Sequence, residues 1–167
     1  MEKITEVYGY KAFDDGLVNR YGSKFEVGKI YTQVGDAKFG NQGNGFHMCT
    51  NLEDTIRYFD SFKGNIEICK VRLFGDMVEY CDEYNGYYDM YAGSNIEILS
   101  KMSRKDIVDE MLALSNEDRI SRFIMGYKMT DKELSFVVDK WKANRRVLEC
   151  IKYYQLDIEE NLKKNKK

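Results

Sequence analysis

The segment that decides the fold reads Gly43-Asn44-Gly45-Phe46-His47-Met48-Cys49-Thr50-Asn51-Leu52-Glu53-Asp54 and continues to Phe62. A glycine-rich loop leads into a short apolar strand, and the strand leads directly into a helix. Thr50 and Glu53 have the spacing of a capping box, in which each side chain accepts a hydrogen bond from the other's backbone N–H. Leu52, Ile56 and Phe59 follow at helical spacing and predict one buried helix face. The chain's single histidine, His47, lies in the predicted strand.

Composition indicates a globular chain of 167 residues, with 43% apolar and 32% charged residues. This length suits one domain, or one domain with an appendage. No stretch approaches the roughly 20 apolar residues that span a bilayer, and the first residues do not resemble a signal peptide. We therefore expect a cytoplasmic protein that does not enter a membrane.

Charge is unevenly distributed along the chain. Residues 1–100 contain 10 basic and 16 acidic residues, whereas residues 101–167 contain 16 basic and 12 acidic residues. The basic excess is small, so nucleic acid is an unlikely partner on sequence grounds. The four cysteines form no C-x-x-C pair and there is one histidine, so we expect reduced, buried thiols and no metal.

The periodicity of the sequence changes near residue 100. Alternating apolar residues predict strands at 7–13, 24–31, 65–73, 77–80 and 95–99, with turn-rich loops at 35–45 and 81–94. Helical periodicity follows, with predicted starts at Ser103, Ser115 and Thr130 and a last helix that reaches about residue 155. We expect an α+β fold: a mostly antiparallel sheet with one embedded helix at 1–100, a helical hairpin or small bundle at 101–160, and a basic tail at 161–167.

Four short motifs occur in the order of a known family. They are Gly9-Tyr10-Lys11-Ala12-Phe13, Glu26-Val27-Gly28-Lys29-Ile30-Tyr31, Gly45-Phe46-His47-Met48-Cys49, and a strand that ends Gly75-Asp76. Over residues 8–100 the chain resembles a family of uncharacterised small proteins encoded by bacteria and their phages. The resemblance implies a shared domain but no known activity.

The order of elements is also similar to that of the ADP-ribosyltransferase fold. Segments 43–58, 68–77 and 95–99 resemble its middle and final elements. The similarity implies that Lys11 and His47 lie near the nicotinamide dinucleotide. Glu97 would bind its ribose and stabilise an oxocarbenium-like transition state. Under this alternative the cofactor is NAD; otherwise we expect none.

Each of these candidates also has a structural interpretation. On this interpretation, His47 is a strand histidine that only forms hydrogen bonds, and Glu97 is the solvent-facing residue between Ile96 and Ile98. Lys11 can equally protect an edge strand from pairing with another sheet. The tyrosines of the 81–94 loop can stack on a base or simply fold over the sheet.

Three classes of function remain from the sequence. The first, which we favour, is a non-enzymatic binding or accessory module of a phage or prophage, with a cleft between the 35–45 and 81–94 loops. Its candidate ligand-binding residues are Tyr10, Gly45, Tyr84 and Tyr88, and its C-terminal helices would contact a protein partner or a second copy. The second is the ADP-ribosyltransferase-like enzyme, or a degenerate relative that binds a nucleotide. The third is a weak nucleic-acid binder acting through the basic helices, although 115–154 lacks the short turn of a helix-turn-helix.

Overall fold

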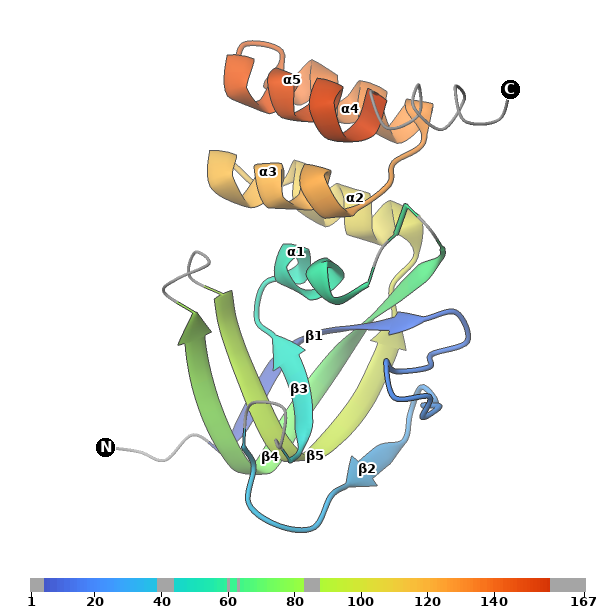
Figure 1. The fold of residues 1–167 in the computed structure, drawn as a ribbon, viewed down its shortest axis with the longest axis vertical. Coiled ribbons are helices and arrows are strands. Elements are labelled where there is room, and N and C mark those ends of the chain that lie inside the picture. Colours follow the sequence, from blue (N-terminus) through green and yellow to red (C-terminus); the bar gives the residue numbers. More distant parts are fainter. Residues whose placement is uncertain (1–4, 39–43, 60, 63, 83–87, 157–167) are drawn as a thin grey trace.

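The computed structural model describes residues 5–38, 44–59, 61–62, 64–82 and 88–156, which form a curled sheet beneath two layers of helices (Figure 1). The strands are β1 (Glu6–Asp14), β2 (Ile30–Thr32), β3 (Phe46–Cys49), β4 (Ile66–Asp82) and β5 (Tyr88–Lys101). The helices are α1 (Leu52–Thr55), α2 (Arg104–Leu112), α3 (Glu117–Gly126), α4 (Asp131–Trp141) and α5 (Arg145–Ile151). A 3-10 turn, η1 (Ile56–Tyr58), follows α1, and a π turn, η2 (Lys152–Leu156), follows α5. The predicted α+β class, an antiparallel sheet followed by C-terminal helices, is confirmed.

The sheet closes on itself. Its strand order is β2-β5-β3-β1-β4, and an additional pairing joins β4 to β5. The strands β5, β3, β1 and β4 therefore form a closed ring, which we call the barrel, while β2 pairs with β5 opposite residues 95–97. All pairings are antiparallel. Each strand of the ring therefore pairs with a strand on both sides, and residues 77–82 of β4 pair with β5.

The barrel has its own apolar interior. Alternation along β1 and β4 sends one set of side chains inward, because successive residues of a strand point to opposite faces. This barrel core consists of Phe13, Leu17, Phe25, Met48, Cys69, Val71, Leu73, Ile96 and Ile98. Phe25 contacts the rings of Phe13 and Tyr31 at centroid distances of 5.3 and 4.7 Å.

Two strands are longer than the sequence predicts. Gly75 and Asp76, which we expected to end a strand, instead form an irregularity in the pairing of β4 with β5. Gly75 has φ +86°, and the Asp76 backbone N–H donates to Ser94 Oγ at 2.9 Å, so the bend is held by local contacts. The predicted 81–94 loop is likewise wrong in large part, since β5 begins at Tyr88. By contrast, the predicted strand at 24–31 is reduced to β2 at 30–32.

The helix that follows β3 is shorter than predicted and begins differently. Asn51 occupies the N-cap position, and its side chain makes no capping hydrogen bond. The predicted Thr50–Glu53 capping box is wrong because the helix begins one residue later, with Asn51 at the N-cap, and the Glu53 carboxylate binds Arg119. After one turn the helix tightens into η1. It lies between the sheet and the α2–α3 layer (Figure 1).

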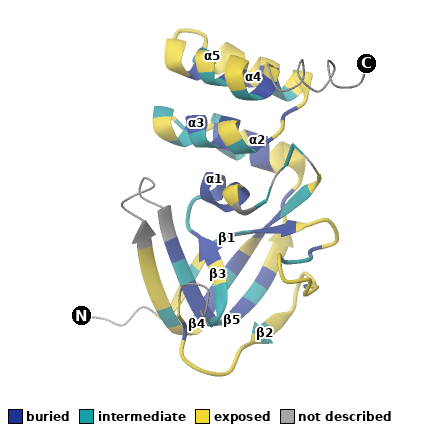
Figure 2. Cartoon of the chain, in the orientation of Figure 1, coloured by how far each residue is buried: buried dark blue, intermediate teal, exposed yellow. Residues whose placement is uncertain are grey.

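A second apolar cluster joins the sheet to the helices. We call it the interlayer core; Ala12, Leu52, Ile56 and Ile68 contribute to it from the first hundred residues. From the helical part it takes Met102, Ile107, Met111, Ile120, Phe123, Ile124, Tyr127, Met129, Leu134, Val137, Val147 and Ile151. Figure 2 shows buried residues where the sheet, α1 and the later helices face one another. The predicted boundary near residue 100 therefore crosses a core that both parts share, and the division of the chain into folding units stays a prediction. The predicted basic tail at 161–167 lies outside the described residues.

Local signals located two of the C-terminal helix starts correctly. Ser103 caps α2 by accepting a hydrogen bond from the Asp106 backbone, and Thr130 and Glu133 form a complete capping box at α4. The predicted start at Ser115 is off by one residue, because Asn116 caps α3. The predicted single helix to residue 155 is also wrong: Asn144 leaves the helical conformation and caps α5 by accepting from the Val147 backbone at 3.0 Å.

Closure of the barrel depends on a close approach of β3 to β1 at Gly9. A Cβ at Gly9 would lie 2.5 Å from the Cys49 carbonyl oxygen and 2.5 Å from Met48 Cε. We expect Gly9→Ala to lower the free energy of unfolding by about 1–3 kcal/mol, the usual range for overpacking a closed site. Urea denaturation measures this change.

Gly64→Ala is the matched control for this substitution. A Cβ at Gly64 would meet nothing within 4 Å. We expect it to change the free energy of unfolding by less than about 0.5 kcal/mol, as for ordinary surface substitutions. Equal stability of the two variants would contradict the assigned contact.

Candidate functional site

The sequence candidates Lys11 and Glu97 lie on opposite faces of the sheet. Lys11 pairs with Cys69 and therefore belongs to the inward-facing set, while Arg72, three residues further along β4, faces outward. Glu97 is the β5 partner of Arg72. Because β1 and β4 pair without interruption over this region, alternation separates Lys11 from Glu97.

Glu97 is held in an ion-pair network on the outer face. Arg72 Nε lies 3.0 Å from Glu97 Oε1, and Arg72 Nη1 lies 3.0 Å from Glu6 Oε2. The Arg72 guanidinium also lies 4.2 Å from the centroid of the Phe74 ring. The Glu97 carboxylate is thus neutralised by a neighbouring cation rather than directed at a cavity.

Lys11 contacts the backbone of His47. Lys11 Nζ donates a hydrogen bond to the His47 carbonyl oxygen at 2.8 Å. Burial lowers the pKa of Lys11 to about 8, because loss of water disfavours the charged amine. Burial and the nearby Lys11 charge both lower the pKa of His47 below its usual range. Lys11 and His47 are therefore neighbours, but Glu97 does not join them.

Of the four candidate ligand-binding residues, only Tyr10 and Gly45 have surroundings that the structure describes. The Tyr10 hydroxyl donates a hydrogen bond to Glu110 Oε1. The pKa of Tyr10 is raised, mainly by burial and secondly by this hydrogen bond. Gly45 has φ +105°, and a Cβ there would lie 2.9 Å from the Gly93 carbonyl oxygen, so glycine is needed where β3 meets β5. Tyr84 lies outside the described residues, as do residues 39–43 and 83–87 of the two loops that border the proposed cleft. Tyr88 begins β5, and its side chain is also outside what is described.

The described thiols have little nucleophilic character. Cys49 and Cys69 are free and buried, as expected from the sequence, whereas the free Cys150 is only half-buried. Burial raises the pKa of Cys49 to about 12 and that of Cys69 to about 11. Since the thiolate is the reactive form, both groups are unreactive near neutral pH.

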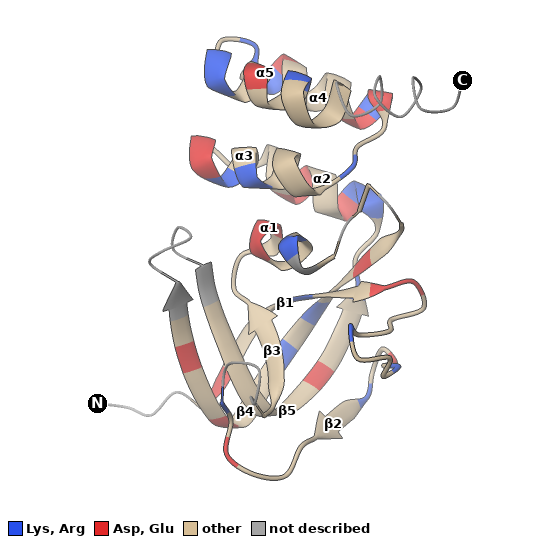
Figure 3. Cartoon of the chain, viewed as in Figure 1, with Lys and Arg blue, Asp and Glu red and all other residues tan. Residues whose placement is uncertain are grey.

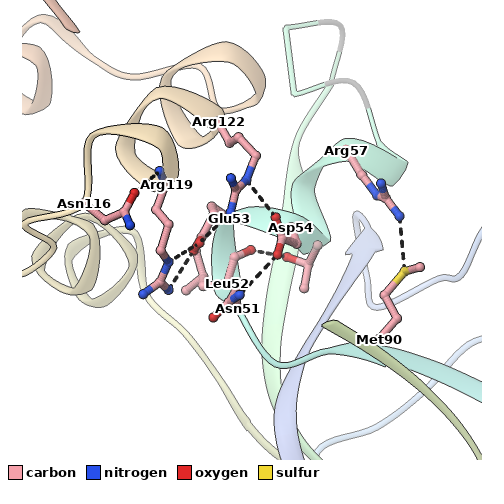
Figure 4. Close-up of polar contacts among 10 residues, drawn as sticks. Asn51, Leu52, Glu53, Asp54, Arg57, Met90, Asn116, Arg119 and Arg122 are labelled. Atoms are coloured by element: carbon pink, nitrogen blue, oxygen red, sulfur yellow. Dashed lines mark hydrogen bonds and ion pairs between the residues drawn. The ribbon is translucent and has the colours of Figure 1, made fainter. Parts of the chain in front are cut away.

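The main cluster of titratable side chains was not found from the sequence. The adjacent carboxylates Glu53 and Asp54 on α1 are 2% and 0% exposed, and they face two arginines of α3 (Figure 4). Arg119 Nη2 lies 3.2 Å from Glu53 Oε2, and Arg122 Nε lies 3.1 Å from Asp54 Oδ1. Burial raises the pKa of Asp54, an effect that the Arg122 charge opposes. Asn51 Nδ2 contacts the other Asp54 oxygen at 3.4 Å.

Tyr10 and Glu110 extend this cluster to the sheet and α2. The Glu110 and Glu53 charges both raise the Tyr10 pKa, whereas Arg119 lowers it, which places these groups in one electrostatic neighbourhood. Glu110 Oε2 is a buried oxygen that has no hydrogen-bond partner among the described residues. The cluster thus connects four elements: β1, α1, α2 and α3.

The only sequence signal for this cluster is weak. Arg119 and Arg122 are one helical turn apart, and Glu53 and Asp54 are adjacent, but each pair alone is typical of a solvated helix face. Arg119 and Glu53 are 66 residues apart along the chain, and Arg122 and Asp54 are 68 residues apart. The arrangement can hold helices together, because the Glu53 and Asp54 carboxylates of α1 are paired with the arginines of α3.

One open pocket of about 530 Å³ lies elsewhere, between the segment before β4 and the α3–α4 connection. Arg104 lines it, with its guanidinium bound to Glu133 at 2.7 Å and to the Lys128 carbonyl at 2.9 Å. None of Lys11, His47 and Glu97 lines this pocket. Within the described part of the chain, no group of three or more His, Cys, Asp or Glu side chains is placed to hold a metal ion.

Fold and site define the chain as a small closed antiparallel barrel with a helical cap joined by buried ion pairs. More specifically, residues 7–110 match the family model of a domain of unknown function, DUF7666, and the chain belongs to that family. Neither the curated proteins nor the solved structures gave a match. The matched segment ends within α2, so α3, α4 and α5 follow it. Among the described residues, none of the helices has the length and apolarity to cross a bilayer.

The buried ion pairs predict a large effect of removing an arginine. Arg119→Ala leaves Glu53, whose side chain is 0% exposed, without its closest cation. Breaking a buried pair usually costs 3–5 kcal/mol, and because Arg119 is about one-third exposed we expect a loss of about 2 kcal/mol. Chemical denaturation of the full chain measures this loss.

Arg145→Ala is the matched control, since Arg145 makes an exposed pair with Glu149 one turn away in α5. Exposed pairs contribute about 0.5 kcal/mol or less. A loss for Arg119→Ala no larger than for Arg145→Ala would show that the Glu53 pair does not hold α3 in place.

The Lys11 environment predicts a pH dependence of stability. The pKa of Lys11 is lowered to about 8 in the folded protein, whereas an unfolded lysine has a pKa of about 10.4. Between these values the unfolded chain binds more protons, so the free energy of unfolding of the wild type rises with pH relative to Lys11→Met. Denaturation at about pH 7 and about pH 10 measures the difference, and parallel pH profiles of the two proteins would refute it.

Proposed function

We propose that the chain is a non-catalytic binding or accessory module of a phage or prophage. The observation that carries this proposal is the separation of the candidate catalytic groups. Lys11 faces inward and is bound to a backbone carbonyl, while Glu97 faces outward and is bound to Arg72. A catalytic site requires such groups to converge on one reacting atom.

The remaining reactive side chains favour the same proposal. The buried carboxylates Glu53 and Asp54 are paired with arginines, and the pKa values of Cys49 and Cys69 are raised. Active sites usually combine shifted pKa values with an accessible cleft. Here the shifted groups are in packed interiors, which suits a structural role.

A protein contact surface is proposed on the outermost helical layer. Phe136 on α4 is 49% exposed, and Tyr153 and Leu156 on η2 are 66% and 45% exposed. Exposed aromatic side chains are enriched where proteins meet. Figures 1 and 2 place α4 and α5 farthest from the sheet, with much of their surface exposed. We propose that this layer mediates contact with a second copy of the chain.

Nucleic-acid binding by the basic helices has less support. Arg146 lies 2.8 Å from Asp118 and Arg145 lies 3.0 Å from Glu149. Lys140 donates to the carbonyl oxygens of Leu112 and Leu114. Figure 3 shows basic and acidic residues interspersed over these helices rather than a continuous basic stripe.

Self-association is tested by light scattering on the full chain over a range of concentrations. We expect the wild-type mass to rise with concentration, and the double variant Phe136→Ser, Tyr153→Ser to remain monomeric because it removes apolar contact area. Tyr21→Ser is the control, since Tyr21 is 84% exposed in the turn that follows β1. A monomeric wild type at every concentration would exclude this contact.

The enzymatic alternative makes a different prediction with nicotinamide ligands. A ligand at about 100 times its dissociation constant adds about 2.7 kcal/mol to stability and raises the melting temperature. A binding module of the proposed kind gives no such rise with NAD or ADP-ribose. A rise that Glu97→Gln abolishes would overturn the proposal in favour of an ADP-ribosyltransferase-like site.

A further inference from the structure

The α1 face of the barrel has the chemistry of a helix-docking surface. Every residue of this one-turn helix is buried, and Leu52 and Ile56 flank the two carboxylates. Most short surface helices bury a single apolar stripe and leave their acidic residues in water. Two adjacent carboxylates between apolar side chains therefore need a partner that supplies both cations and apolar contact.

Helix α3 supplies both. Arg119 and Arg122 are one turn apart and reach Glu53 and Asp54, while Ile120, Phe123 and Ile124 enter the interlayer core. At its end α3 approaches closely, since a Cβ at Gly126 would lie 3.1 Å from Ile56 Cδ1. Both the cations and the apolar side chains of α3 therefore contact the segment of α1 and η1.

Among the described residues, the buried side chains of the barrel core all lie between Phe13 and Ile98, so α3, α4 and α5 contribute none of them. The chain joins α2 to α3 through residues 113–116 alone, and the family match ends just before this point, at residue 110. The division between barrel and later helices therefore coincides with one short connection.

Polar contacts cross this division beside the interlayer core. Besides the two arginine–carboxylate pairs, Arg104 binds Glu133, Lys140 binds the Leu112 carbonyl, and Ser61 Oγ donates to the Gly126 carbonyl. Charged groups that leave a buried pair become hydrated again. The free energy needed to separate a contact that contains such pairs is therefore lower than for a purely apolar contact of equal area.

We propose that α3, α4 and α5 form a cap that opens from the barrel as one unit. The α1 face that this opening uncovers then binds an amphipathic helix with two arginines one turn apart. In the closed protein the occupant is α3 itself. This inference does not depend on the proposed self-association, which concerns the opposite side of the cap.

Hydrogen exchange on the full chain tests whether the cap opens as a unit. We expect the amides of α3, α4 and α5 to share one opening equilibrium that is more populated than the opening of β4 and β5. Ile98→Val, in the barrel core, destabilises the closed and the cap-open forms equally. It should therefore speed exchange in the barrel several-fold and leave the cap unchanged. Arg119→Ala should speed exchange in the cap.

The opposite pattern would overturn the proposal. If cap and barrel amides exchange together in the wild type, or if Ile98→Val speeds both equally, the chain opens only by unfolding as a whole. The wild-type and Ile98→Val comparison decides this even where Arg119→Ala does not fold.

A synthetic peptide tests the helix-docking chemistry. The probe contains residues 115–128, and the matched control peptide carries Arg119→Glu and Arg122→Glu. We expect saturable binding of the probe to the full-length chain, at a rate limited by cap opening, and at least tenfold weaker binding of the control. Equal binding of both peptides, or none by the probe, would show that the α1 face does not recognise an arginine-bearing helix.

Discussion

The close approach of β3 to β1 at Gly9 is the constraint on which the rest of the molecule depends. It lets the sheet close, because β3 then reaches β5 on one side and β1 on the other. Closure gives the barrel an interior of its own. It also fixes where the chain leaves β3, so that α1 lies between the barrel and the helices.

The position of α1 explains why charge is buried in this fold. Glu53 and Asp54 can be enclosed only where cations meet them, since an unpaired buried carboxylate is strongly unfavourable. Arg119 and Arg122 meet that need and thereby fix the orientation of α3. The polar cluster and the interlayer core act together: the apolar contacts supply most of the favourable free energy, and the ion pairs select one alignment.

Features set by neighbouring residues could be predicted well. The caps at Ser103 and Thr130 depend on hydrogen bonds across three residues, and the inward set of β4 depends on simple alternation. Predictions from local sequence patterns were wrong at Glu53, Asn144 and Gly75. Glu53 bound Arg119 instead of completing a cap, Asn144 interrupted a continuous apolar stripe, and Gly75 became a bend within a strand because β5 runs alongside it.

The sequence by itself determined the α+β class, the antiparallel sheet and the helical character of the C-terminal third, because these follow from periodicities of two and 3.6 residues. Tertiary structure decided the site. Whether Lys11, His47 and Glu97 converge depends on the register of β1 with β4 and of β4 with β5, and that register puts Lys11 and Glu97 on opposite faces. The pairing of α1 carboxylates with α3 arginines was equally hidden, since only packing brings together charges that lie more than sixty residues apart along the chain.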